Sequence, residues 1–174
     1  MTSNPLLDEI STVRVIRPFH TVAYIISLEK GQAKYLLMKR CGEYLTGNWQ
    51  MVSGGIEEGE TAWQAALREI KEETNLVPDR FYSADIVESF YEFSWDSIVM
   101  APVFVAFIDT LQTVQLSSTE HDDYHWLPYS EACDLLEFSN QQRIIQHIQE
   151  NFINKIPNER FRIHATQFLP LNAS

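Results

Sequence analysis

The stretch GGIEEGETAWQAALREIKEETNL, residues 54–76, decides how the chain folds. It joins a glycine-rich loop directly to an amphipathic segment. Thr61 and Gln64 form a capping-box pattern at the start of that segment. Asn75 stands where a helix commonly ends in the left-handed conformation, which Asn tolerates better than most residues. The positions expected to face the core recur at helical spacing: Trp63, Leu67, Ile70 and Thr74. The stretch therefore predicts a helix between Thr61 and Asn75, entered from a flexible loop.

The second half of this helix carries three acids that should repel one another. Glu69, Glu72 and Glu73 stand at i, i+3 and i+4 and so share one helix face, where like charges cost ~0.2–0.5 kcal/mol per pair. They also lie toward the C-terminal end, where the helix dipole disfavours negative charge. Oxygen-only clusters of this kind suit Mg²⁺ or Mn²⁺. The preceding loop adds further acids: Glu57, Glu58 and Glu60. We expect a divalent-cation site, although for the helix alone a solvated acidic face is the competing interpretation.

Composition and length limit what the whole chain can be. Its 174 residues suffice for one domain with a proper core. A formal charge of −11, with no run of Lys or Arg, argues against long nucleic acid as a partner. The sequence shows no apolar run of bilayer-spanning length and no secretory signal pattern, so we expect no membrane partner. With only Cys41 and Cys133, a disulfide framework is not expected, and we predict a cytoplasmic protein.

The remaining sequence predicts strands interleaved with a few helices, the pattern of a mixed-sheet α/β or α+β domain. Residues 12–27 are β-prone, with Pro18 dividing them into two candidate strands. A turn at 29–32 leads into a strand at 34–40, which predicts a hairpin. Further expected elements are strands at 80–94 and 98–109, the second covered on both faces, a short strand turning into a helix at 124–132, and a helix at 139–152 with Ser139 or Asn140 near its N-cap.

Residues 54–76 resemble the Nudix box, a pattern of Gly, five residues, Glu, seven residues, then Arg-Glu-apolar-x-Glu-Glu-x-Gly-apolar. The matching residues here are Gly54, Glu60, Arg68, Glu69, Ile70, Glu72, Glu73 and Leu76. Asn75 replaces the final Gly. It is the mildest replacement where a positive φ is wanted. The resemblance implies a Nudix-type mixed β-sheet sandwiched between α-helices, with a domain over residues 10–152 and a C-terminal extension over 153–174.

The resemblance also implies roles for matching residues in hydrolysis of a nucleoside diphosphate linked to another moiety. Glu69, Glu72 and Glu73 resemble the acids that bind Mg²⁺ and support catalysis, with Glu69 considered also as the base. Gly54 matches the position whose carbonyl faces the metal. Glu60 and Arg68 resemble the ion pair that holds the loop against the helix. The segment STEHDDYHWLPYSEA, residues 118–132, resembles the branch that cleaves dATP and dihydroneopterin triphosphate, in which Glu120 matches an added metal ligand.

Residues outside the box are candidates for holding the substrate. Lys39, Arg40 and Arg17 could contact phosphate, with Arg40 preferred, or could be solvated strand residues. His121 could act as a base or a phosphate donor, although a loop histidine without such a role is the more common case. Aromatic rings could stack on a base or pterin, while most such rings belong to cores. The candidates are Trp49, Tyr44, Phe90, Tyr91, Phe93 and Trp95.

The function predicted by this resemblance is a Mg²⁺-dependent pyrophosphohydrolase, with Mn²⁺ as an alternative metal. Its substrate would be a nucleoside (dATP-like) or pterin triphosphate, cut to the monophosphate and pyrophosphate. An ADP-ribose or dinucleoside polyphosphate hydrolase is the alternative within the family. A non-catalytic nucleotide-sensing module is the alternative outside enzymes, and the retained acids argue against it. A homodimer stays open, because the sequence does not decide the oligomeric state.

Overall fold

The computed structural model describes residues 16–29, 31–43, 45–109, 112–117 and 119–164. Three sequence predictions therefore fall partly or wholly outside the described residues. They concern the domain start at 10–15 with most of the first candidate strand, the aromatic residue Tyr44, and residues 165–174 of the C-terminal extension.

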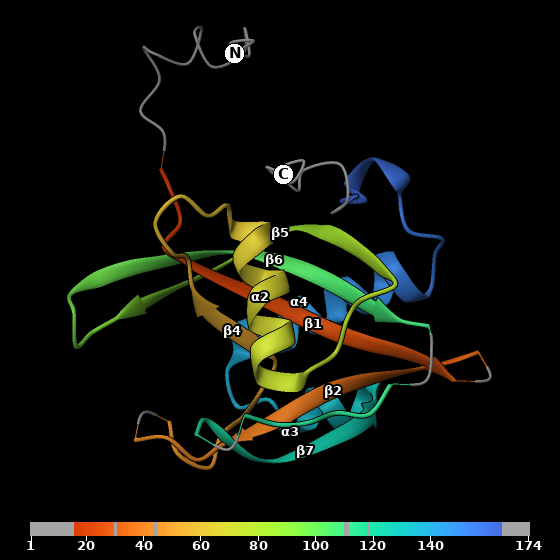
Figure 1. Cartoon of the computed structure of the whole chain (residues 1–174), viewed down its shortest axis with the longest axis horizontal. Coiled ribbons are helices and arrows are strands. Elements are labelled where there is room, and N and C mark those ends of the chain that lie inside the picture. Colours follow the sequence, from red (N-terminus) through yellow and green to blue (C-terminus); the bar gives the residue numbers. More distant parts are fainter. Residues whose placement is uncertain (1–15, 30, 44, 110–111, 118, 165–174) are drawn as a thin grey trace, which may run out of the picture.

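One mixed sheet forms the centre of the molecule, and helices cover both of its faces (Figure 1). Strand order along the sheet is β3-β2-β1-β6-β5, with β4 paired to β1 and β7 paired to β2. β1 and β6 run parallel, and the other pairs are antiparallel. The strands are β1 (His20–Glu29), β2 (Gln32–Arg40), β3 (Trp49–Gln50), β4 (Val52–Gly55), β5 (Arg80–Glu92), β6 (Ser97–Ile108) and β7 (His121–Pro128). The predicted mixed-sheet fold class is confirmed.

Helix α2 (Ala62–Thr74) is the helix predicted from the opening stretch. The side-chain oxygen Oε1 of Gln64 accepts a hydrogen bond from the backbone N–H of Thr61, as the capping-box pattern predicts. At the other end, Asn75 adopts the left-handed conformation with φ 58° and ψ 11°. Its backbone N–H donates to the Lys71 carbonyl, which closes the last turn. Both helix boundaries are therefore set by local sequence.

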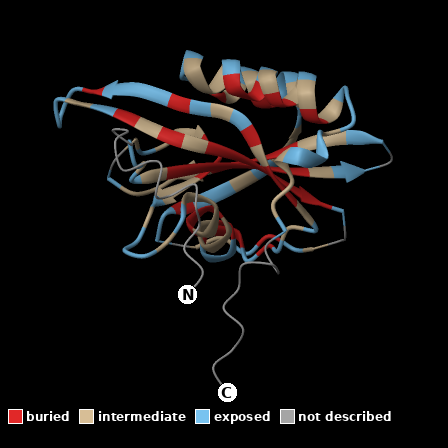
Figure 2. Cartoon of the chain, turned by 90° about the horizontal axis from the view of Figure 1, so that it is seen from above, coloured by how far each residue is buried: buried red, intermediate tan, exposed pale blue. Residues whose placement is uncertain are grey.

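Two hydrophobic clusters pack on opposite faces of the sheet. In Figure 2 the buried residues concentrate along the central strands and on the helices that cover them. One cluster lies beneath α2 and includes Ile70 and Leu76. The other lies beneath α3 (Tyr129–Leu135) and α4 (Ser139–Ile148) and includes Ile144 and Ile145. Alternate residues of the central strands supply the two clusters, because successive strand side chains point to opposite faces. In β2, Leu37 joins the α4 side and Met38 joins the α2 side.

The structure corrects several predicted boundaries. Residues 16–18 are not in a strand, and β1 begins only at His20, after Pro18. Helix α4 begins at Ser139, as predicted, with Phe138 as its N-cap. The predicted helix over 139–152 ends as an α-helix at Ile148 and continues as a π-helical turn, Gln149–Ile153. Prediction of these ends failed because tertiary packing, and not local propensity, decides where the chain leaves each element.

Strand β6 is buried on both faces only over its second half, residues 103–108. Its first half pairs with β5 alone in a hairpin that extends beyond the rest of the sheet, as Figure 1 shows. The predicted two-sided burial over 98–109 is therefore correct for one half and wrong for the other. The aromatic candidates of this region, Phe90, Tyr91, Phe93 and Trp95, are exposed on or next to the hairpin.

Part of the C-terminal segment packs on the sheet. Residues Glu159–Phe161 form a 3₁₀ turn beside β5. Arg162 makes an isolated bridge with Tyr82, and the backbone N–H of Ile163 donates to the Phe81 carbonyl at 2.8 Å. None of the helices in the described ranges is both long and apolar enough to cross a membrane.

Candidate metal and phosphate site

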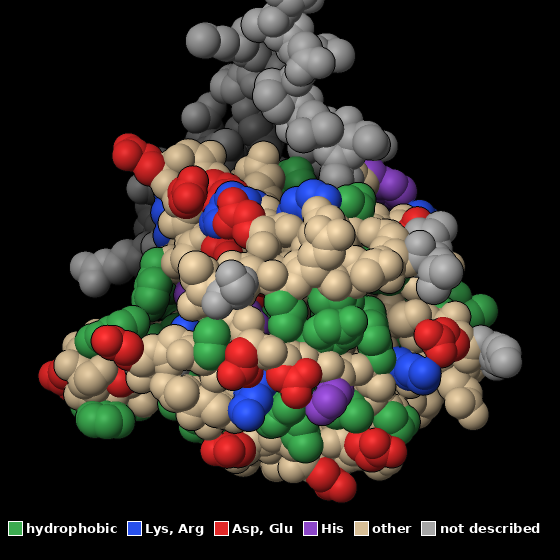
Figure 3. Space-filling view, turned by 60° about the horizontal axis from the view of Figure 1, so that its bottom comes forward, with side chains coloured by type: hydrophobic (Ala, Val, Ile, Leu, Met, Phe, Trp, Pro, Cys, Tyr) green, Lys and Arg blue, Asp and Glu red, His purple; other side chains and the backbone are tan. Residues whose placement is uncertain are grey.

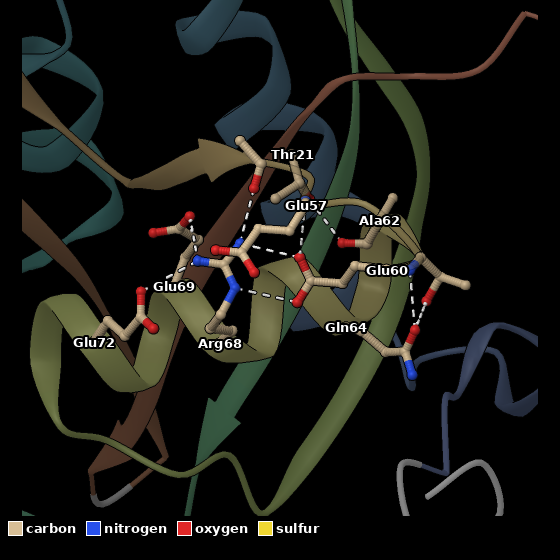
Figure 4. Close-up of polar contacts among 10 residues, drawn as sticks. Thr21, Glu57, Glu60, Ala62, Gln64, Arg68, Glu69 and Glu72 are labelled. Carbon is tan, nitrogen blue, oxygen red and sulfur yellow. Dashed lines mark hydrogen bonds and ion pairs between the residues drawn. The ribbon is translucent and has the colours of Figure 1, made fainter. Parts of the chain in front are cut away.

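Arg68 is the centre of the hydrogen bonds that attach the glycine-rich loop to α2 (Figure 4). Its guanidinium binds Glu60 through two contacts, Nε to Oε1 at 3.1 Å and Nη2 to Oε2 at 3.0 Å. Nη2 also donates to the Gly55 carbonyl at 2.8 Å. This forked geometry is available to Arg and not to Lys. The hydrogen bond from Arg68 is the main cause that lowers the pKa of Glu60, so that acid is held ionised.

The same guanidinium contacts two of the helix acids. Nη1 of Arg68 donates to Glu69 at 2.8 Å and to Glu72 at 3.1 Å. The Glu69 side chain is largely buried, at 12% exposure, whereas that of Glu72 is 59% exposed. Burial raises the pKa of Glu69, and Arg68 opposes that rise. Arg68 therefore neutralises much of the negative charge that the sequence places on this helix face.

Gly54 and Glu69 fit together because glycine has no side chain. A Cβ atom placed on Gly54 would overlap Cδ, Oε1 and Cγ of Glu69. The neighbouring Gly55 has no such contact, since nothing lies within 4 Å of a Cβ placed there. Gly54 is therefore required by the close approach of the Glu69 carboxylate, and Gly55 is not.

Glu73 differs from the other acids because it is buried beneath the helix, at 1% exposure. The interpretation of the three acids as one solvated face is wrong for Glu73, which is buried while Glu72 is exposed. Neither of its carboxylate oxygens has a hydrogen-bond partner among the residues that the structure describes. Burial, helped by the nearby charges of Glu120 and Glu69, raises the pKa of Glu73 to about 9. A buried carboxyl without partners carries a desolvation cost that a bound cation would offset.

The loop before β7 is tied to the end of α2 and brings two predicted residues to Glu73. The backbone N–H of Ser117 donates to the Glu73 carbonyl at 3.0 Å, and that of His121 donates to the Ser117 carbonyl at 3.1 Å. The charge of Glu120 raises the pKa of both Glu69 and Glu73, which places the three acids close together. These contacts join residues more than forty positions apart, so the sequence pattern alone does not predict them.

His121 is buried beside Glu73 instead of lying open to solvent. It is 1% exposed, and its Nδ1 lies 3.9 Å from Oε2 of Glu73. Burial, together with the charge of Arg40, lowers the pKa of His121 to about 4, so its ring is neutral at pH 7. Gln50 lies on the other side of the ring, with 3.4 Å between its Nε2 and the Nε2 of His121. The sequence reasoning missed Gln50, although a polar residue between apolar ones just before β4 was a signal for it.

The predicted substrate-binding residues divide between the two faces of the sheet. Arg40 lies on the α2 side, because its charge acts on Glu73, His121 and His20. Lys39 and Trp49 are paired across β2 and β3 and point to the opposite face. The Trp49 ring stacks on His125, with 4.6 Å between ring centroids. The exposed Arg17 lies just before β1. Of these four residues, the structure brings only Arg40 together with the acids.

The donor set fits a divalent cation, although the acids are not yet arranged around one. Among the described residues, no three His, Cys, Asp or Glu side chains are grouped so as to hold a metal. Arg68 donates hydrogen bonds to two of the candidate acids, Glu69 and Glu72. However, the charges of Glu120 and Glu69 act on Glu73, and neither oxygen of Glu73 has a hydrogen-bond partner among the described residues. Oxygen donors of this type, with several positions left for water, are what Mg²⁺ and Mn²⁺ prefer.

Comparison with known proteins agrees with this geometry. A family model described as NUDIX domain matches residues 18–148. The chain is 35% identical over 111 residues to a dihydroneopterin triphosphate diphosphatase of Escherichia coli, which covers 58% of this chain and 74% of that protein. It is 25% identical over 117 residues to an asymmetrical bis(5'-nucleosyl)-tetraphosphatase of Caenorhabditis elegans, which covers 67% of this chain and 83% of that protein.

A solved structure shares the fold. The E. coli dihydroneopterin triphosphate pyrophosphohydrolase superposes with a TM-score of 0.65 at 24% identity, covering 80% of this chain and 97% of that one. At this level of identity the superposition supports the arrangement of strands and helices, and nothing about the substrate.

Proposed function

The chain belongs to the Nudix family, and on that basis we propose that it is a Mg²⁺-dependent pyrophosphohydrolase that cleaves a nucleoside or pterin triphosphate to the monophosphate and pyrophosphate. The family assignment makes the chain a hydrolase of phosphorus anhydrides. One observation carries the finer proposal. Glu73 is buried, its carboxylate oxygens have no hydrogen-bond partner among the described residues, and the charges of Glu120 and Glu69 act on it, while Gly54 admits the Glu69 carboxylate.

The bound cation would be held by Glu69, Glu73 and Glu120, with Glu72 and the Gly54 carbonyl as further oxygen donors. Divalent ions of this class neutralise phosphate oxygens and lower the pKa of bound water. Glu69 would also orient the attacking water, since its carboxylate lies against Gly54 of the loop. Arg68 would have to give up part of its contact with Glu69 and Glu72 for both acids to turn to a cation, while its paired contacts to Glu60 keep the loop fixed.

Arg40 is the proposed phosphate contact on the protein side. It is the cation whose charge lowers the pKa of His121 and of His20, and it is among the groups that lower the pKa of Glu73. A substrate phosphate near Glu73 would therefore lie within the field of Arg40. Lys39 and Trp49, on the opposite face, could reach only parts of the substrate that extend around the sheet.

Small phosphate esters suit the surface better than long nucleic acid. On the face shown in Figure 3, Lys and Arg side chains are scattered singly among acidic ones, and they form no continuous basic stripe. The net charge of −11 points the same way, because long nucleic acid is bound chiefly through its phosphates.

The preference for a nucleoside or pterin triphosphate rests on the 35% identical dihydroneopterin triphosphate diphosphatase. A dinucleoside tetraphosphate is the second candidate, since a tetraphosphatase matches over 67% of the chain. Adding Mg²⁺ to the protein with dATP, dihydroneopterin triphosphate, diadenosine tetraphosphate and ADP-ribose in parallel decides between them. Pyrophosphate release from a triphosphate supports the proposal. Turnover of the tetraphosphate or of ADP-ribose alone would contradict it, and binding without turnover of any of the four would favour a sensing module.

A further inference from the structure

Three buried polar side chains meet behind α2, each from a different element. Gln50 comes from β3, Glu73 from α2 and His121 from the first position of β7, and they are 7%, 1% and 1% exposed. Polar groups buried this deeply are normally hydrogen-bonded. Yet both carboxylate oxygens of Glu73 and the Nδ1 atom of His121 lack a partner among the described residues. These unpartnered atoms face one another across 3.9 Å.

The orientation of the Gln50 amide indicates which nitrogen of His121 carries the proton. The amide nitrogen Nε2 of Gln50 lies 3.4 Å from Nε2 of His121, and an amide nitrogen can only donate. His121 Nε2 must then accept. A neutral imidazole carries one N–H, which is therefore on Nδ1 and points toward Glu73. In this orientation His121 directs a donor toward Glu73, whose carboxylate oxygens have no hydrogen-bond partner among the described residues.

We propose that His121 is a positioning residue for Glu73, with Gln50 fixing its tautomer. The proposal rests on the function proposed above, in which Glu73 binds the cation. A shift of about 1 Å would bring Nδ1–H and Oε2 to a normal hydrogen-bond length. That bond holds one oxygen of Glu73 and leaves the other directed at the cation. His121 itself touches neither cation nor substrate. This role differs from the phosphate or base role predicted from sequence, because a side chain buried to this extent is not open to substrate.

Partners that orient a ligating carboxylate typically change metal affinity by about 10- to 100-fold when they are removed. A ring that only fills space beside Glu73 would affect stability and leave affinity largely unchanged. The distinction requires a variant that keeps the donor at Nδ1 and one that moves it. His121→Asn places an amide N–H close to the former Nδ1 position. His121→Gln places its amide near the former Nε2 position instead.

Two measurements on the substrate-free protein test the proposal. The ¹⁵N resonances of the His121 ring, recorded without metal, should show the Nδ1–H tautomer. In Gln50→Leu the same resonances should show a mixture of the Nδ1–H and Nε2–H tautomers. Calorimetric titration with Mn²⁺ should give similar affinities for wild type and His121→Asn. His121→Gln and Gln50→Leu should each bind Mn²⁺ about 10-fold or more weakly. His125→Asn, on the same strand but on the opposite face, is the control and should bind like wild type.

An Nε2–H tautomer in the wild type, or unchanged Mn²⁺ affinity in both His121→Gln and Gln50→Leu, overturns the proposal. If His121→Gln fails to fold by circular dichroism, Gln50→Leu carries the test, since it leaves the ring in place. Failure of the proposed function looks different. In that case the wild type hydrolyses no triphosphate, while the tautomer and the Mn²⁺ titration are still measurable without substrate.

Discussion

The carboxylate of Glu69 occupies the space where a side chain at Gly54 would stand. This relationship joins the last strand before the loop to the middle of α2, fifteen residues later. It explains why the glycine loop and the acidic helix must occur together in one motif. It can also be tested with a matched control, because a side chain at the adjacent Gly55 would meet no other atom within 4 Å of its Cβ.

Replacement of Gly54 by Ala should remove activity without unfolding the protein. The new methyl group forces Glu69 out of its position, and misplacement of a catalytic group by about 1 Å can cost 10²-fold in rate. We expect kcat/KM on the best substrate of the panel to fall at least that far. Gly55→Ala is the matched control and should stay within about twofold of wild type, because nothing lies near its Cβ. Equal losses in the two variants would contradict the assignment.

Arg68→Lys should loosen the loop because lysine cannot make the forked contact with Glu60. Arg68 also holds Gly55, Glu69 and Glu72, so we expect activity to fall by about 10- to 100-fold, together with a lower Tm. Arg80→Lys is the control. Arg80 makes a similar two-point contact with Asp109, at 2.6 Å for each bond, away from the acids. That variant should change Tm slightly and keep full kcat/KM, and a comparable loss of activity there would refute a specific role for Arg68.

Glu73→Gln should abolish hydrolysis while the fold survives. Burial raises the pKa of Glu73 to about 9, so without metal the carboxyl is mostly protonated at pH 7. The neutral amide that replaces it should therefore leave the metal-free variant at least as stable as wild type. Metal binding should be lost. We therefore expect Mn²⁺ to raise the Tm of wild type and to leave that of Glu73→Gln unchanged. Near-normal turnover by this variant would rule out Glu73 as a ligand.

Asn75→Ala should destabilise the end of α2 more than Asn75→Gly does. Position 75 has φ 58°, a conformation that costs a residue such as Ala about 1 kcal/mol and costs Gly little. Both variants lose the hydrogen bond from Asn75 to Gln115. The difference between their free energies of unfolding therefore reports the cost of the positive φ at this position. Urea unfolding should show Asn75→Gly as the more stable of the two by about 1 kcal/mol. The same unfolding midpoint for both would mean that φ at this position is not under strain.

Glu88 should make stability depend on pH. It is 5% exposed, and burial raises its pKa from 4.5 to about 7. The folded protein thus binds this proton more tightly than the unfolded chain does. Because ionised Glu88 is disfavoured in the folded protein, the free energy of unfolding falls as pH rises from about 4.5 to about 7, by about 1.4 kcal/mol per pH unit. Above that range this contribution no longer changes with pH.

Glu88→Gln removes that pH-dependent contribution. Relative to wild type, the variant should gain stability from pH 5 to pH 8, by up to about 3 kcal/mol in urea unfolding. The other titrating groups are the same in both proteins, so their contributions cancel in the difference between the two free energies of unfolding. A stability difference that does not change with pH would show that Glu88 ionises normally in the folded protein.

Local patterns predicted the elements that local interactions determine. The capping box at Thr61, the left-handed stop at Asn75 and the hairpin of β1 and β2 each depend on residues a few positions apart, and all three are confirmed. The Nudix resemblance likewise follows from spacing within 23 residues, and the family match over residues 18–148 confirms it. The end of α4 at Ile148 was not predicted, because packing against the sheet decides it.

What the sequence by itself determined is the motif: a glycine loop, an acidic helix and the ion pair between Glu60 and Arg68. Only the tertiary structure decided how each acid is used. It buries Glu73 against the sheet, leaves Glu72 exposed and sets Lys39 and Trp49 on the far face. The physical reason is that burial and facing depend on strand register and on a loop more than forty residues away, whose backbone hydrogen bonds to α2 bring Glu120 and His121 to Glu73.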